Sequence, residues 1–68
     1  MSFIGENLKH LRTEAGMTAR ELAIEMDVHR ATISHWESGK WEIPDERIEE
    51  LAEIFDVTFE ELMYGVMR

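Results

Sequence analysis

Residues 22–40, LAIEMDVHRATISHWESGK, decide the fold of this chain. Two short segments with helical spacing of their apolar residues flank residues 27–29, a connection too short for anything but a tight turn. Val28 is placed to fill the corner between the two helices, and Ile33 and Trp36 face inward and hold the second one in place. This distribution is the one that a helix-turn-helix requires.

The opposite face of the second helix in this unit carries mostly short or polar side chains. A helix turns by about 100° per residue. With Ile33 and Trp36 inward, the outward residues are Arg30, Ala31, Ser34, His35 and Ser38. A helix that needed only solubility would be expected to carry Lys and Glu there. We therefore interpret these five residues as a base-facing surface for double-stranded DNA.

Each of these side chains has more than one interpretation. The fork of Arg30 fits the O6 and N7 acceptors of guanine, but a phosphate contact or a solvated role explains it equally well. Ala31 suits contact with a thymine methyl group, or serves only as a helix former. Ser34 and Ser38 can bond to bases or phosphates without choosing strongly between them.

Further residues flank this face and are candidates for phosphate contacts. They are Thr18, Arg20, His29, Lys40 and Trp41. Arg20 falls in the first turn of a helix, where free backbone N–H groups attract anions. A purely solvated role is the alternative for each cation. Because His29 and His35 gain charge as the pH falls, we expect tighter DNA binding at about pH 6 than at about pH 8.

The rest of the chain also has helical spacing, and no strand-like alternation persists. One face of a first helix comprises Ile4, Leu8, Leu11 and Ala15. Gly16 follows where a left-handed residue would end that helix. Thr18 and Glu21 have the spacing of a capping box that opens the second helix.

A fourth and a fifth helix are expected after the helix-turn-helix. Asp45 is the expected N-cap of the fourth. Its inward residues are Ile48, Leu51, Ala52 and Phe55. Thr58 and Glu61 form a second capping box. The sequence thus predicts an all-α fold, a compact single domain of five short helices over residues 1–68, with the helix-turn-helix at about residues 18–38.

The charge of the chain is unevenly placed. Its 68 residues have a formal net charge of −8. Residues 42–68 hold nine acidic and two basic residues, whereas residues 1–41 hold six acidic and five basic ones. The acidity therefore belongs to the C-terminal part. It forms a solvated face, or a surface that repels DNA or recruits a basic partner through the fourth helix.

Several classes of protein do not fit this sequence. There is no cysteine, so disulfides and thiolate metal ligands are absent. No apolar run approaches the ~20 residues of a membrane span, and the N-terminus lacks the apolar block of a signal peptide, so we expect a soluble, cytoplasmic protein. His10, His29 and His35 lack metal-site spacing. No catalytic arrangement or cofactor motif is present, so an enzyme is not expected.

The segment LAIEMDVHRATISHWESGK resembles the helix-turn-helix of phage-repressor and Cro-type (Xre-like) regulators. The resemblance extends from IGENLKHLRTEAGMT through WESGKWEIPDERIEELAEIFDV to TFEELMYG. It implies a five-helix DNA-binding domain that acts as a dimer on palindromic operators, with bases read by the third helix in the major groove. It also implies that Arg12 pairs with Glu37 and that both are structural.

This sequence departs from the family pattern at three positions. Ala19 stands where the family often has Gln, at a place that usually helps to bind phosphate or a base. Asp27 replaces the usual turn glycine, although Asp tolerates a left-handed conformation better than most residues. His29 stands where Ser or Thr commonly caps the third helix. The first departure bears on DNA affinity and the other two on helix geometry.

The apolar C-terminal tail suggests a homodimer. We expect its interface to comprise Trp41, Leu62, Met63, Tyr64, Val66 and Met67. Exposed apolar patches of this kind mark partner surfaces. Trp41 sits where the family frequently has a basic residue; packing on a sugar-phosphate edge or covering the core are its alternatives. A protein-interaction module on the same fold, an antirepressor or adaptor with weakened DNA binding, is the alternative function.

Overall fold

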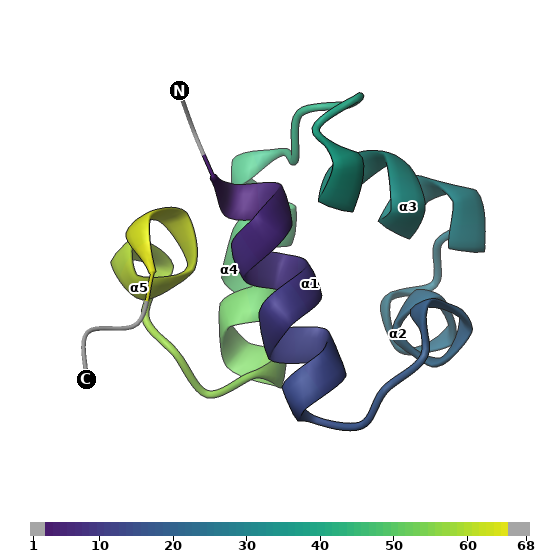
Figure 1. The fold of residues 1–68 in the computed structure, drawn as a ribbon, viewed down its shortest axis with the longest axis horizontal. Coiled ribbons are helices and arrows are strands. Elements are labelled where there is room, and N and C mark those ends of the chain that lie inside the picture. Colours follow the sequence, from purple (N-terminus) through teal and green to yellow (C-terminus); the bar gives the residue numbers. More distant parts are fainter. Residues whose placement is uncertain (1–2, 66–68) are drawn as a thin grey trace.

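A computed structural model describes residues 3–65, which form five helices. They are α1 (Ile4–Glu14), α2 (Ala19–Met26), α3 (Arg30–Ser38), α4 (Asp45–Ile54) and α5 (Phe59–Tyr64). In Figure 1, α1 and α4 lie in the middle of the molecule, with α2 and α3 on one side of them and α5 on the other. The all-α, five-helix fold that the sequence predicts is confirmed for this part of the chain.

Every helix contributes to one core. Each supplies a fully buried aliphatic side chain: Leu8, Leu22, Ile33, Leu51 and Leu62, in chain order. Trp36 is buried beside them, as predicted, and Ile43 adds a buried residue from the α3–α4 loop. Burying one such side chain stabilises the fold by about 1.5–3 kcal/mol, so the core holds α3 firmly.

Three helices end in the same kind of turn. Gly16, Asp27 and Asp56 adopt left-handed backbone conformations, with φ of 71°, 56° and 54°. The next residue then donates its N–H to a carbonyl at the end of the helix: Met17 to Arg12, Val28 to Ala23 and Val57 to Ala52. These Schellman-type turns satisfy carbonyls that the helix leaves free, and they set the apolar residue against the core.

Both predicted capping boxes are formed. The backbone N–H of Thr18 donates to Glu21 Oε1 at 2.8 Å, and the N–H of Glu21 donates to Thr18 Oγ1 at 3.0 Å. Thr58 and Glu61 repeat the pattern at 2.9 Å and 3.0 Å. Because the free N–H groups at these helix starts are satisfied locally, α2 and α5 begin where the sequence indicates.

Two expectations about helix ends are wrong. Pro44, not Asp45, is the N-cap of α4, because its backbone is extended (ψ 146°) while Asp45 is already helical. The Asp45 carboxylate still lies in the first turn, where the helix dipole favours a negative charge. Ala15 does not share the buried face of α1; it is exposed because the helix ends at Glu14.

Three contacts that place the helices were not anticipated. Asn7 Nδ2 donates to the carbonyl of Leu62 at 2.9 Å and ties α5 to α1. Arg47 Nη1 donates to the carbonyl of Met26 at 3.2 Å and joins α4 to the end of α2. Gly5 is buried where α1 meets the C-terminal end of α3.

Candidate nucleic-acid interface

The outward face of α3 is the surface that the sequence singled out. Ile33 and Trp36 are buried and fix the rotation of the helix about its axis. Four of the five predicted base-facing residues are exposed, namely Arg30, Ala31, Ser34 and Ser38, and the fifth, His35, is half-buried. The structure therefore brings all five onto one helix, with four of them exposed and His35 partly accessible.

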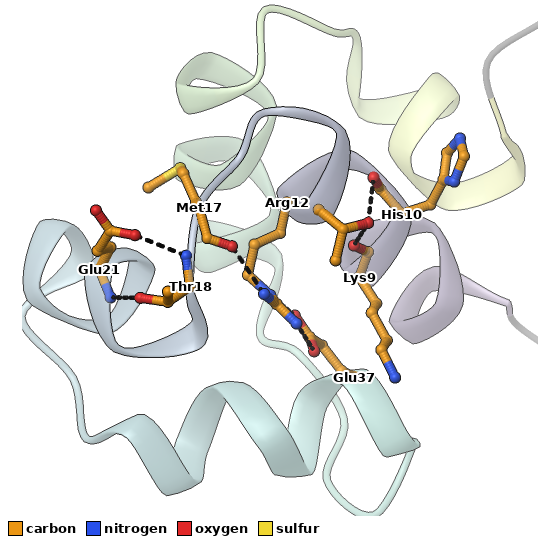
Figure 2. Close-up of polar contacts among 8 residues, drawn as sticks. Lys9, His10, Arg12, Met17, Thr18, Glu21 and Glu37 are labelled. Atoms are coloured by element: carbon orange, nitrogen blue, oxygen red, sulfur yellow. Dashed lines mark hydrogen bonds and ion pairs between the residues drawn. The ribbon is translucent and has the colours of Figure 1, made fainter.

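An ion pair holds α3 against α1. Arg12 Nε donates to Glu37 Oε2 at 2.6 Å, and Arg12 Nη2 donates to Glu37 Oε1 at 3.0 Å. Figure 2 shows the guanidinium lying between Glu37 and Met17, and its Nη1 donates to the Met17 carbonyl at 2.8 Å. The hydrogen bonds that Arg12 donates to Glu37 raise the pKa of Arg12 above its ordinary value. Arg12 and Glu37 thus form the pair that the resemblance implies, and it fixes α3 in position.

The start of α2 presents a positive side chain beside a negative one. Arg20 is exposed in the first helical turn. The backbone N–H of Thr18 donates to the Glu21 carboxylate, and the Thr18 hydroxyl oxygen accepts the backbone N–H of Glu21. Hydrogen bonding of the carboxylate to the Thr18 backbone N–H, and then to its side chain, lowers the pKa of Glu21. Figure 2 shows the two residues facing each other at this helix end. Arg20 is therefore the group that remains available to an anion here, whereas Thr18 has its hydrogen bonds within the chain.

The end of α3 is shaped by an aromatic contact. The rings of His35 and Trp41 lie 4.3 Å apart between centroids and are tilted by 55°. The backbone N–H of Trp41 also donates to the His35 carbonyl at 3.2 Å. Trp41 remains 49% exposed. This contact places Trp41 at the rim of the α3 surface.

Ser38 and Lys40 lie on the same turn. Ser38 Oγ donates to the carbonyl of His35 at 3.2 Å and accepts the Lys40 backbone N–H at 3.4 Å. The Ser38 hydroxyl is thus committed to the helix end, a role that the sequence did not suggest. The side chain of Lys40 is exposed just past Gly39, which ends α3 in a left-handed conformation.

His29 occupies the N-cap of α3 without forming a side-chain capping bond. Its backbone is extended (φ −71°, ψ 146°), as it is at Thr18 (φ −80°, ψ 160°). A Thr in this conformation caps α2, so the weaker cap expected from the sequence is confirmed. The imidazole is exposed at the start of α3, next to Arg30.

Lys9 belongs to this surface and was missed. It lines a shallow hollow together with Ala19 and with Ser34 and Ser38 of α3. A signal for it was present: Lys9 precedes Arg12 by three residues, and residues at this spacing share a helix face. Since Arg12 was expected to reach α3, Lys9 could have been assigned to the same side of α1.

The expected dimer surface is only partly accessible. Leu62 is fully buried in the core, so its assignment to an interface is wrong: α5 turns this residue inward. Met63 is half-buried, and Tyr64 is 82% exposed. Val66 and Met67 lie outside the described residues. Within residues 3–65, the accessible apolar side chains of the expected surface are therefore fewer than the sequence suggested.

Two other kinds of feature are absent from residues 3–65. No group of three or more His, Cys, Asp or Glu side chains in this range is arranged to hold a metal ion. The helices of the same range are too short and too polar to cross a membrane.

Comparison with known proteins agrees with this geometry. A family model described as helix-turn-helix matches residues 8–62. The chain belongs to this helix-turn-helix family. The match runs from α1 into α5, so it includes the whole outward face of α3, and the resemblance to Xre-like regulators is confirmed.

Two relatives of this helix-turn-helix chain are transcription regulators by name. The HTH-type transcriptional activator BcrR of Enterococcus faecalis is 40% identical over 60 residues, which are 88% of this chain and 29% of the relative. The HTH-type transcriptional repressor RghR of Bacillus subtilis (strain 168) is 40% identical over 65 residues, 94% of this chain and 48% of the relative. The chain thus spans less than half the length of these curated relatives.

Proposed function

We propose that this helix-turn-helix chain is a DNA-binding transcription regulator that reads an operator with α3 in the major groove. The observation that carries this proposal is the combination of an accessible outer face with a fixed inner one. Arg30, Ala31 and Ser34 are exposed, while the buried Ile33 and Trp36 prevent the helix from rotating. Base readout requires side chains held in a constant register relative to the groove.

Within this proposal, Arg30 contacts a base. It is the first residue of α3, and the N-terminal residues of a recognition helix are those that reach base edges. Its guanidinium group can donate two hydrogen bonds, to O6 and N7 of guanine. Arg20 and Lys40 are both exposed near the two ends of this surface, where they are suited to contact phosphates.

We further propose that the operator is palindromic and the chain a homodimer. Tyr64 and Phe3 are large, exposed apolar residues, as is Trp41. Such residues support a contact between copies, with Met63 at its edge. A two-fold dimer requires a two-fold operator, with half-sites about one helical turn of DNA apart.

The acidity of the chain weakens this proposal only slightly. Residues 42–68 carry most of the formal charge of −8. Exposed charges are largely screened beyond about 8–10 Å at physiological salt, so the local potential at α3 matters more than the total. A protein-interaction module is the second candidate, favoured by the exposed acidic residues of α4, Glu46, Glu49, Glu50 and Glu53.

One experiment distinguishes the transcription regulator from the protein-interaction module. The purified chain is used to select binding sites from random duplex DNA, and binding to any enriched site is then titrated with salt. A two-fold motif whose binding weakens steeply with salt supports the regulator, because phosphate contacts release counterions. No enrichment at low salt supports the interaction module. An enriched motif without two-fold symmetry would retain DNA reading but contradict the dimer.

A further inference from the structure

The hollow beside α3 has a composition that the reading of bases does not explain. Its volume is about 320 Å³, and it lies between α1, the start of α2 and α3. Its walls are Lys9, Arg12, Ala19, Ser34, Glu37 and Ser38. Because Ser34 and Ser38 belong to the outward face of α3, a DNA backbone that follows this face passes over the hollow.

One positive charge in the hollow is not neutralised. Arg12 is paired with Glu37 through two hydrogen bonds, of 2.6 Å and 3.0 Å, so the charges of these two side chains cancel. Lys9 is exposed and, within residues 3–65, its ammonium group has no hydrogen bond or ion pair. Figure 2 shows its side chain extending from α1 on the side where Arg12 meets Glu37. The net charge of the walls is therefore that of Lys9.

A hydroxyl donor accompanies this cation. Ser34 is exposed, and its hydroxyl has no hydrogen bond to another described residue, whereas the Ser38 hydroxyl is committed to the His35 carbonyl at 3.2 Å. Ala19 adds a methyl group and leaves the space open. An ammonium group and a free hydroxyl beside an open space are donors that suit a phosphate oxygen.

We infer that Lys9 is a phosphate-binding residue of this interface, with a DNA backbone phosphate over the hollow between its ammonium group and the Ser34 hydroxyl. The inference rests on the proposed function. Lys suits this role because its ammonium is a flexible point charge that carries no base preference. The contact compensates for Ala19, which has no polar side chain to offer at the start of α2.

Salt titration of DNA binding with Lys9→Gln tests the inference. One lost phosphate contact should reduce the slope of log Kobs against log salt by about 0.9 and weaken binding about five- to tenfold at 0.1 M salt. The loss of affinity should be the same for the enriched site and for sequence variants of that site. Lys9→Arg should retain the affinity of the unchanged chain. Glu53→Gln, a change of one charge on α4, should leave the slope unaltered.

The outcomes separate this inference from the proposal beneath it. If the unchanged chain binds no DNA, the proposed function fails and this inference with it. If the chain binds and Lys9→Gln has the same slope and affinity, the inference alone fails, provided that thermal melts show both proteins folded. A loss of affinity confined to one base sequence would also overturn the inference. So would saturable binding of inorganic phosphate, observed by NMR at the backbone amide of Ser34, since it would indicate a site for a free anion.

Discussion

Arg12 of α1 and Glu37 of α3 are joined by two hydrogen bonds, of 2.6 Å and 3.0 Å, although 25 residues separate them in the chain. The side chains are only 11% and 8% exposed, so solvent screens the pair weakly. This contact fixes the end of α3 that lies farthest from the α2–α3 turn. The outward face is thereby held in register along its whole length.

Glu37→Ala should destabilise the fold by about 3 kcal/mol. Removing one partner of a largely buried pair leaves the other charge uncompensated. Arg12 would keep its bond to the Met17 carbonyl, which limits the loss. Urea unfolding measures this, and Arg12→Met with Glu37→Met is the control, because replacing both charges by apolar groups is often neutral. If the single and double variants lost equal stability, packing rather than charge would explain the effect.

Gly5→Ala should also destabilise the chain, against the trend of helix propensity. In a helix interior, Ala is favoured over Gly by about 0.8–1.0 kcal/mol. A Cβ on Gly5, however, would lie 2.5 Å from the carbonyl oxygen of Trp36 and 2.6 Å from that of Glu37. Because both obstacles are backbone atoms, α1 and α3 must separate.

Thermal or urea unfolding of Gly5→Ala should show a net loss of about 1–3 kcal/mol, the usual cost of overpacking. Glu6→Ala, at the exposed neighbouring position of α1, is the control and should change stability little. A gain in stability for Gly5→Ala would mean that the close approach of α1 to α3 is not required.

The sequence predicted those features that depend on residues near one another in the chain. The capping boxes of α2 and α5 are four-residue patterns, and the inward face of α3 follows from the spacing of Ile33 and Trp36. The capping boxes determine where helices start, and the apolar spacing determines how a helix is rotated about its axis. They do not determine which backbone atoms of distant helices meet, so Gly5 was not recognised as a contact point.

The parts of the site that escaped prediction depend on tertiary distance. Lys9 lies beside Ser34 only because α1 packs across α3, and no local pattern encodes that separation. Leu62 was assigned to an interface because apolar residues crowd the tail, yet the direction of α5 turns it into the core. Counting apolar residues could not distinguish it from Tyr64, which points outward.

Glu21 should make the stability of the fold depend on acid pH. Hydrogen bonds from the Thr18 backbone N–H and side chain lower the pKa of Glu21 below its ordinary value of 4.5. A carboxyl group whose pKa is lower in the folded chain stabilises the fold above its unfolded pKa, and this contribution is lost as the pH falls through the folded value. The ionised carboxylate also lies in the first turn of α2, where the helix dipole stabilises a negative charge.

The melting temperatures of the unchanged chain and of Glu21→Gln should therefore differ near neutral pH and converge as the pH falls below the ordinary pKa of 4.5 and through the lower folded value. Glu25→Gln lies in the same helix, takes no part in the capping box and serves as the control. A difference that persisted unchanged to about pH 3 would show that the charge of Glu21 does not contribute.

Arg30 and Lys40 should respond differently to substitution if α3 reads bases. Arg30→Ala should cost about 1–3 kcal/mol of binding and relax the preference at one base pair, as expected of a bidentate guanine contact. Lys40→Ala should weaken binding uniformly across sequences and reduce the salt slope by about 1. Fluorescence anisotropy on the selected operator and on single-base variants measures both. A uniform loss for Arg30→Ala would reassign that residue to a phosphate.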